Sequence, residues 1–216
     1  MSVAQSNAIK VDFRDSSWQR ALKKALDLNL PVRWEDGVLL VACHGECKSA
    51  GWHRVDWSAR GLTCDCPSRH PCHHRARAWC EWMSDWGTLV AIAHAHGAEA
   101  AVRWVVWQET GELDPTPIRP LRDVRLWRAC GYALADVPHA VRHSPTGIEW
   151  GYGGSGPADL ARSILMHFYG PAVAEALYQR FKWDVVARIP RGVREYVLPA
   201  EQIAGWVEAA AARAAA

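Results

Sequence analysis

The stretch Cys64-Asp-Cys66-Pro-Ser-Arg-His-Pro-Cys72-His-His74 decides how the first half of this 216-residue chain folds. Cysteine and histidine are ligands that Zn²⁺ prefers, and a structural zinc site holds four of them in a tetrahedron. Cys64 and Cys66 stand two positions apart, so a turn at the end of a strand can direct both thiolates to one point. The flanking prolines disfavour helix in the loop that follows. The sequence predicts one structural zinc ion bound by Cys64, Cys66, Cys72 and His74.

The fourth ligand has two competitors, because His73 is adjacent to His74 and His70 is near. Three thiolates and Zn²⁺ leave a net charge of about −1, which suits the N-terminus of the helix expected next. A site with four protein ligands has no open position for water. Such a site contributes to folding and does not catalyse, so we expect no metal-dependent hydrolysis.

Two hairpins and a helix are expected before the cysteine cluster. Ser16 can cap a helix that presents Trp18, Leu22 and Leu26 on one face and ends at Pro31. The strand-like segments are 32–34 with 38–42, around the turn Glu35-Asp36-Gly37, and 52–57 with 62–64, around the turn 58–61.

A helical pattern follows over residues 74–86. It places four large side chains on one stripe: Trp79, Trp82, Met83 and Trp86. We interpret this stripe as core packing, because a platform for stacking bases has to be exposed. The longest apolar stretch, residues 89–107, is interrupted by charged and histidine side chains. It therefore predicts a buried helical pair rather than a membrane span.

The N-terminus has no apolar segment of the kind that a signal peptide requires. We expect a soluble, cytoplasmic protein without a membrane partner, in which clustered cysteines favour metal binding over disulfides. Cys43 and Cys47 are close enough in sequence to invite a second metal site. They lack two further ligands, and we interpret them as ordinary small residues. Cys80 and Cys130 are expected to be core thiols.

The C-x-C-x5-C-x-H spacing, after a hairpin and before a helix, resembles the SWIM-type zinc finger over roughly residues 38–86. The strand HRVDW at 53–57, CDCP at 64–67 and CHHRARAW at 72–79 carry the resemblance. It implies that the C-x-C cysteines and the later C-x-H bind one zinc, which again selects Cys64, Cys66, Cys72 and His74. SWIM-like fingers are associated with DNA binding and with protein–protein contact.

Charge alone does not indicate a nucleic-acid binder, because 25 basic and 23 acidic residues leave a net charge of only +2. Arginines are nevertheless dense around the predicted finger, where a fixed loop and helix could present them to phosphates. The candidate contacts are Arg60, Arg69, Arg75 and Arg77. The alternative is that these arginines only solvate an exposed face.

Residues 109–120 (ETGELDPTPIRP) are rich in proline, acid and threonine, which predicts a linker. Beyond it, we expect a strand at 148–152, helices at 157–169 and 171–188, a strand at 194–198 and a helix from Pro199. Proline at the start of a helix suits a position that needs no amide hydrogen.

A glycine-rich turn lies between the first of these strands and its helix. Backbone amides there could cradle an anion, and the candidate residues are Gly153, Gly154, Ser155 and Gly156. The turn lacks the Walker and dinucleotide-binding spacings. The alternative is a tight turn in which Ser155 caps the helix. Glu149 and Asp159 flank the turn, but the sequence does not place them together.

The string SPTGIEWGYGGSGPADLA at 144–161, followed by LYQRFKWDVVARIP at 177–190 and IAGWV at 203–207, looks like a small uncharacterised domain family. That family is common in phage, plasmid and other mobile-element proteins, and the resemblance covers roughly residues 121–207. It implies genomic context more than chemistry.

Together these features predict an α+β protein of two small units. Residues 1–108 would form the SWIM-like zinc domain, 109–120 the linker, and 121–216 an α+β domain of unknown function. We expect a non-enzymatic, mobile-element accessory protein that contacts DNA, RNA or a nucleic-acid-processing partner. The alternative is a protein-interaction adaptor or an inhibitor of a host defence complex. An enzyme that uses the glycine-rich turn is a third reading.

Overall fold

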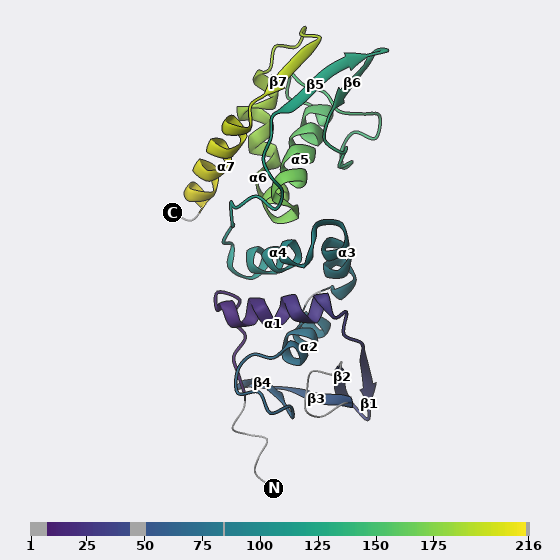
Figure 1. Cartoon of the computed structure of the whole chain (residues 1–216), viewed down its shortest axis with the longest axis vertical. Helices are drawn as coiled ribbons and strands as arrows, with labels where there is room; N and C mark the ends of the chain where they lie inside the picture. The colour runs from purple at the N-terminus through teal and green to yellow at the C-terminus, as the bar shows by residue number, and fades with distance from the viewer. Residues whose placement is uncertain (1–7, 44–50, 84, 215–216) are drawn as a thin grey trace. The chain divides into compact units, whose positions relative to one another are not determined.

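A computed structural model of the chain describes residues 8–43, 51–83 and 85–214 (Figure 1). The chain divides into two units, Met1–Thr110 and Gly111–Ala216. Both combine helices with a small antiparallel sheet, which confirms the α+β class. None of the helices in the described part of the chain has both the length and the apolar character needed to cross a bilayer.

The first unit contains a four-stranded antiparallel sheet in the order β1-β2-β3-β4. Its strands are β1 (Val32–Glu35), β2 (Val38–Cys43), β3 (Gly51–Ser58) and β4 (Gly61–Cys64). Both predicted hairpins are confirmed. At the first turn, Asp36 and Gly37 have φ of 50° and 76°, a left-handed conformation that aspartate and glycine adopt at low cost.

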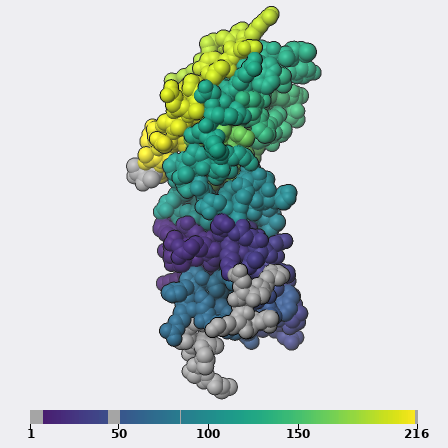
Figure 2. Space-filling model, in the orientation of Figure 1, coloured from purple at the N-terminus to yellow at the C-terminus, as the bar shows by residue number. Residues whose placement is uncertain are grey.

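Helices cover one side of this sheet. They are α1 (Ser16–Asp27), α2 (His73–Met83), α3 (Trp86–His96) and α4 (Ala98–Thr110). Helix α2 lies between the sheet and α1, whose residues form a purple band on the space-filling surface (Figures 1 and 2). Trp18 and Leu22 of α1 and Leu62 of β4 belong to one buried core. The side chain of Asp15, rather than Ser16, accepts the capping hydrogen bond from the amide of Ser17.

The single helix expected at 74–86 is two helices, because α2 ends at Met83 and Asp85 caps α3. Consequently only part of the predicted apolar stripe packs in the core. Trp79 is buried, Trp82 and Trp86 are half-buried, and Met83 is 57% exposed. The predicted helical pair exists as α3 and α4, but α3 buries only Leu89 among its residues.

The second unit holds a three-stranded antiparallel sheet in the order β6-β5-β7. Its elements are β5 (Val124–Ala129), β6 (Tyr132–Ala135), α5 (Ser155–Tyr169), α6 (Pro171–Asp184), the short 3-10 helix Val186–Arg188, β7 (Glu195–Leu198) and α7 (Ala200–Ala214). Val124 and Leu126 of β5 share a buried core with Phe168 and Phe181 of the helices. Residues 148–152, which we expected to be a strand, pair with no other strand in the described chain.

The segment expected to be a linker is built into its neighbours. Glu109 and Thr110 are the last residues of α4. Further along, the backbone amides of Ile118 and Arg119 donate to the carbonyl of Phe168 at 2.7 and 3.4 Å. The end of the proline-rich segment is therefore hydrogen-bonded to α5 of the second unit, and Leu113 packs against the core of that unit.

Candidate metal centre

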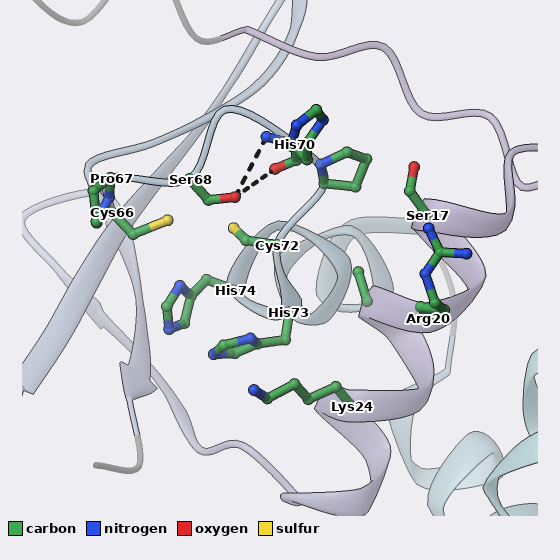
Figure 3. Close-up of a pocket in the computed structure, with 12 residues that line it drawn as sticks. Ser17, Arg20, Lys24, Cys66, Pro67, Ser68, His70, Cys72, His73 and His74 are labelled. Atoms are coloured by element: carbon green, nitrogen blue, oxygen red, sulfur yellow. Dashed lines mark hydrogen bonds between the residues drawn. The ribbon is translucent and has the colours of Figure 1, made fainter. Parts of the chain in front are cut away.

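Three structural elements bring the four predicted ligands together. Cys64 ends β4, Cys66 lies in the turn after it, Cys72 immediately precedes α2, and His74 is in the first turn of α2. Their ligand atoms all lie within 4.8 Å of one another, and all four residues are buried. Figure 3 shows the side chains of Cys66, Cys72 and His74 converging from the loop and the helix.

The spacing of these atoms fits a tetrahedral zinc ion. Cys64 Sγ lies 3.9 Å from His74 Nδ1. Zinc–sulfur and zinc–nitrogen bonds of ordinary length at the tetrahedral angle would place such a pair about 3.6 Å apart. Small shifts of the side chains would therefore admit the ion, with Nδ1 as the coordinating nitrogen.

The three thiols compete for one negative charge. Hydrogen bonds from the thiols of Cys64 and Cys72 lower the pKa of Cys66 far below that of a free thiol. The pKa of Cys64 is strongly raised. The hydrogen bond of its thiol with Cys66 has the largest effect, followed by the hydrogen bond with Cys72 and by burial. One thiolate is thus stabilised at the expense of its neighbours. A divalent cation removes this competition, because it stabilises every coordinating thiolate at once.

His74 is the histidine that faces the cysteines, and its side chain is completely buried. The ring of His73 contacts that of His74 with centroids 4.1 Å apart. His70 is exposed, and its backbone exchanges hydrogen bonds with the hydroxyl of Ser68. Neither His70 nor His73 belongs to any of the metal-capable groups found among the described residues.

A further histidine, His53 of β3, lies beside this centre and was missed in the sequence. Its Nδ1 is 2.7 Å from a carboxylate oxygen of Asp65, the residue between the first two cysteines. Its Nε2 is buried and has no hydrogen-bond partner in the described structure. The pairing of Val55 with Cys64 could have revealed it, because His53 lies two positions away on the same face of β3.

His53 also lies close to Cys43, which the sequence analysis interpreted as an ordinary small residue. Ligand atoms of Cys43, His53 and His74 lie within 4.8 Å of one another. Cys43 is half-buried at the end of β2, and Cys47 lies outside the described residues. The six described cysteines carry no disulfide. Cys80 is buried as expected, whereas Cys130 is exposed on the surface and is not a core thiol.

Two of the four arginines predicted to contact nucleic acid are inside the protein. Arg75 is fully buried and donates to the carbonyls of His70 at 3.0 Å and Ser68 at 3.4 Å. Arg77 is 4% exposed, and it donates to the carbonyl of Leu30. Burial argues against a contact of these two residues with nucleic acid, because their guanidinium groups donate to backbone carbonyls and are not presented to solvent.

Arg60 and Arg69 are exposed. Two further basic residues line a cavity of about 740 Å³ between α1 and the cysteine loop (Figure 3). Arg20 and Lys24 of α1 line one side, and His70 and His73 line the other. No aspartate or glutamate occurs among the described residues that line it.

The glycine-rich turn of the second unit is packed closely against aromatic and charged side chains. A Cβ atom on Gly153 would overlap the indole of Trp183, and one on Gly156 would lie 2.8 Å from Cβ of Glu149. Ser155 is the first residue of α5 rather than its cap, since Gly154 occupies that position without a side-chain hydrogen bond. An anion cradle is disfavoured, because a ring fills the space beside Gly153 and a carboxylate lies near Gly156.

Glu149 and Asp159 do not form a carboxylate pair. Glu149 binds the guanidinium of Arg128 through both oxygens, at 2.7 and 2.8 Å. Asp159 is completely buried and accepts the backbone amides of Arg142, His143 and Ser144. Each carboxylate therefore holds a separate part of the second unit in place.

Comparison with known families finds one match. Residues 122–209, most of the second unit, match the model of a family of unknown function named DUF6166. No curated protein and no solved structure matches the chain. The second unit thus resembles an uncharacterised family, as its sequence predicted. No model of a SWIM-type finger matches the first unit, so that resemblance stays a prediction from the sequence motif.

Proposed function

We propose that the first unit binds one structural zinc ion through Cys64, Cys66, Cys72 and His74, and that the chain is a non-enzymatic accessory protein that contacts nucleic acid. The observation that carries the metal proposal is the convergence of four buried ligand atoms from β4, the loop and α2. Bound zinc would supply no catalysis. It would hold three thiolates together and tie the loop to the start of α2.

Contact with nucleic acid is supported by the two basic side chains of α1 that line the cavity beside the cysteine loop. Arg20, Lys24, His70 and His73 surround it, and Arg69 is exposed on the same loop. A phosphate backbone approaching this face would meet the basic side chains of Arg20 and Lys24, which project from α1. The cytoplasm suits this proposal because it keeps such thiols reduced. A mobile-element origin remains part of the proposal through the resemblance of the second unit.

Metal analysis and binding measurements test the two parts separately. The purified chain should contain about one zinc, and Cys66→Ala should lose it and unfold the first unit. Cys130→Ala is the matched control, because Cys130 is exposed and lies in the other unit. Binding to labelled DNA and RNA should weaken steeply with salt. A folded chain without metal would overturn the zinc centre. No binding to any nucleic acid at low salt would overturn the functional proposal.

The second candidate is a protein-interaction adaptor, including an inhibitor of a host defence complex. Trp34 and Trp57 are 53% and 46% exposed, and both contact Trp82 edge to face. Exposed tryptophans of this kind are common at protein interfaces. A pull-down from the native host with nuclease-treated and untreated arms separates the candidates. A defined protein captured equally in both arms, and lost in Trp34→Ala, would favour the adaptor.

A further inference from the structure

Two exposed aromatic rings meet at the glycine-rich turn of the second unit. The side chains of Trp183 and Tyr152 are 56% and 37% exposed. Trp183 is the penultimate residue of α6, whereas Tyr152 lies in the turn before α5. The indole of Trp183 lies against Gly153, and the ring of Tyr152 lies against Gly154. Segments that are about thirty residues apart therefore present two rings at one dipeptide.

Gly153 and Gly154 are required for space rather than for backbone conformation. Gly154 has a φ of −127°, and Gly153 is not among the described glycines with a positive φ. A side chain at either position would overlap one of the two rings. The turn thus makes room for two aromatic groups that stay partly exposed to water, so each buries less apolar surface than a residue of the core. This arrangement points to a role for the rings at the surface.

Cations lie over both rings. Lys182 Nζ is 4.6 Å from the ring centroid of Trp183, and the guanidinium carbon of Arg191 is 5.0 Å from that of Tyr152. The segment 180–194 contains five basic residues and one acid, but Lys182 is buried and Arg180 lies 3.8 Å from the acid. That acid, Asp184, already accepts the indole N–H of Trp206. Arg188, Arg191 and Arg194 are exposed.

We propose that Trp183 and Tyr152 form a stacking platform for the bases of single-stranded nucleic acid, with Arg191 and its basic neighbours contacting the phosphates. This inference rests on the proposed function and assigns that function a site in the second unit. Bases stack on exposed aromatic rings whatever their sequence, and nearby arginines supply charge and cation–π contact. The platform is expected to bind with little sequence preference.

The observations favour a single strand over the other partners. Bases in a duplex already stack on one another, so their faces do not reach side chains at the surface. A protein partner could also use tryptophan, tyrosine and arginine. The exposed side chains of Arg188, Arg191 and Arg194, in the segment that follows Trp183, nevertheless match a polyanion better than a protein surface of mixed charge.

Fluorescence anisotropy with the full zinc-loaded chain tests the platform, using a labelled single-stranded oligonucleotide and the matching duplex at low salt. Binding to the single strand should be tighter. Trp183→Leu and Tyr152→Leu should each weaken it on the order of tenfold, because leucine keeps an apolar contact with the glycines but cannot stack. Trp183→Phe should restore most of the affinity. Tyr132→Ala is the matched control, since Tyr132 of β6 is 65% exposed in the same unit.

The outcomes separate this inference from the proposed function. If both leucine variants bind the single strand as tightly as the wild type does, the platform is overturned, whereas the proposed contact with nucleic acid is not. A wild-type chain that binds no nucleic acid would overturn both. Specific capture of one host protein that is lost in Trp183→Leu, without oligonucleotide binding, would assign the rings to a protein interface and overturn the inference. Melting temperatures of all variants confirm that each is folded.

Discussion

The imidazole rings of His53 and His74 lie against each other, with centroids 4.2 Å apart and planes inclined by 36°. His53 comes from β3 and His74 from α2, so the contact joins the sheet to the helix at the metal centre. Because Asp65 holds the other side of the His53 ring, β3 also holds the turn between Cys64 and Cys66. Residues that orient ligands in this way are typical of the shell around a bound metal.

This relationship predicts the outcome of replacing each nearby histidine. His74→Ala should abolish stoichiometric zinc binding, because it removes the ligand that faces the cysteines. His53→Ala should weaken zinc affinity about 10–100-fold by releasing the loop from β3. His70→Ala and His73→Ala should bind zinc as the wild type does. Competition with a chromogenic chelator measures the four affinities, and loss of zinc in His73→Ala alone would show that the fourth ligand is misassigned.

Arg75 should be important for folding and not for binding. Arg75→Ala should lower the free energy of unfolding by about 2–4 kcal/mol, because it removes a fully buried side chain together with its hydrogen bonds to the loop carbonyls of Ser68 and His70. Arg75→Lys should rescue little, since an ammonium lacks the planar array of donors. Denaturant unfolding of the zinc-loaded protein measures the change.

Arg69→Ala is the control for this prediction, because Arg69 is exposed on the same loop. Its free energy of unfolding should stay within about 0.5 kcal/mol of the wild type. An Arg75→Ala protein with unchanged stability would contradict the buried role.

Gly151 should tolerate no side chain. Its φ is +83°, and a Cβ atom there would lie 2.6 Å from Cα of Arg191. Gly151→Ala should therefore cost more than about 2 kcal/mol of stability through backbone strain and overlap with a neighbouring main chain. Gly192→Ala is the matched control, because no atom lies within 4 Å of the added carbon. Equal melting temperatures for the two variants would refute the close approach at Gly151.

The stability of the second unit should fall in acid through Asp159. Burial raises the pKa of Asp159, but hydrogen bonds from the amides of Arg142, Ser144 and His143 lower it more, so its pKa is below the ordinary value. A carboxylate with a depressed pKa stabilises the fold above its unfolded pKa of about 3.9. That contribution is lost as the pH falls through the lower, folded pKa.

Asp159→Asn should remove this contribution and cost about 1.5–3 kcal/mol at neutral pH. The free energy of unfolding should also fall less between pH 6 and pH 3 in the variant than in the wild type. Urea unfolding at several pH values checks both effects, with the exposed Glu208→Gln as control. A wild type and an Asp159→Asn variant with parallel pH profiles would show that Asp159 is not the group responsible.

Local features were readable from the sequence where short-range chemistry decides the conformation. The hairpin turn at Asp36 and Gly37 and the helix preceding Leu30 are examples. The hairpin of β5 and β6 was missed although its turn has the expected geometry. Cys130 and Gly131 both have positive φ, at 51° and 82°, but cysteine is an unusual residue for that conformation. Residues 148–152 were predicted to form a strand, and that prediction is wrong. The alternation of apolar residues is real, since Ile148 and Trp150 are buried, but the segment joins no sheet.

The sequence by itself determined the buried cysteine–histidine cluster, because the spacing of Cys64, Cys66, Cys72 and His74 confines the four side chains to the end of one strand, one turn and the start of one helix. Only the tertiary structure decided which surrounding groups face solvent. Arg75 is buried and His53 stands beside the centre because the sheet, α2 and α1 pack as successive layers. Burial depends on contacts between segments that are far apart in the chain, and residue spacing does not encode those contacts.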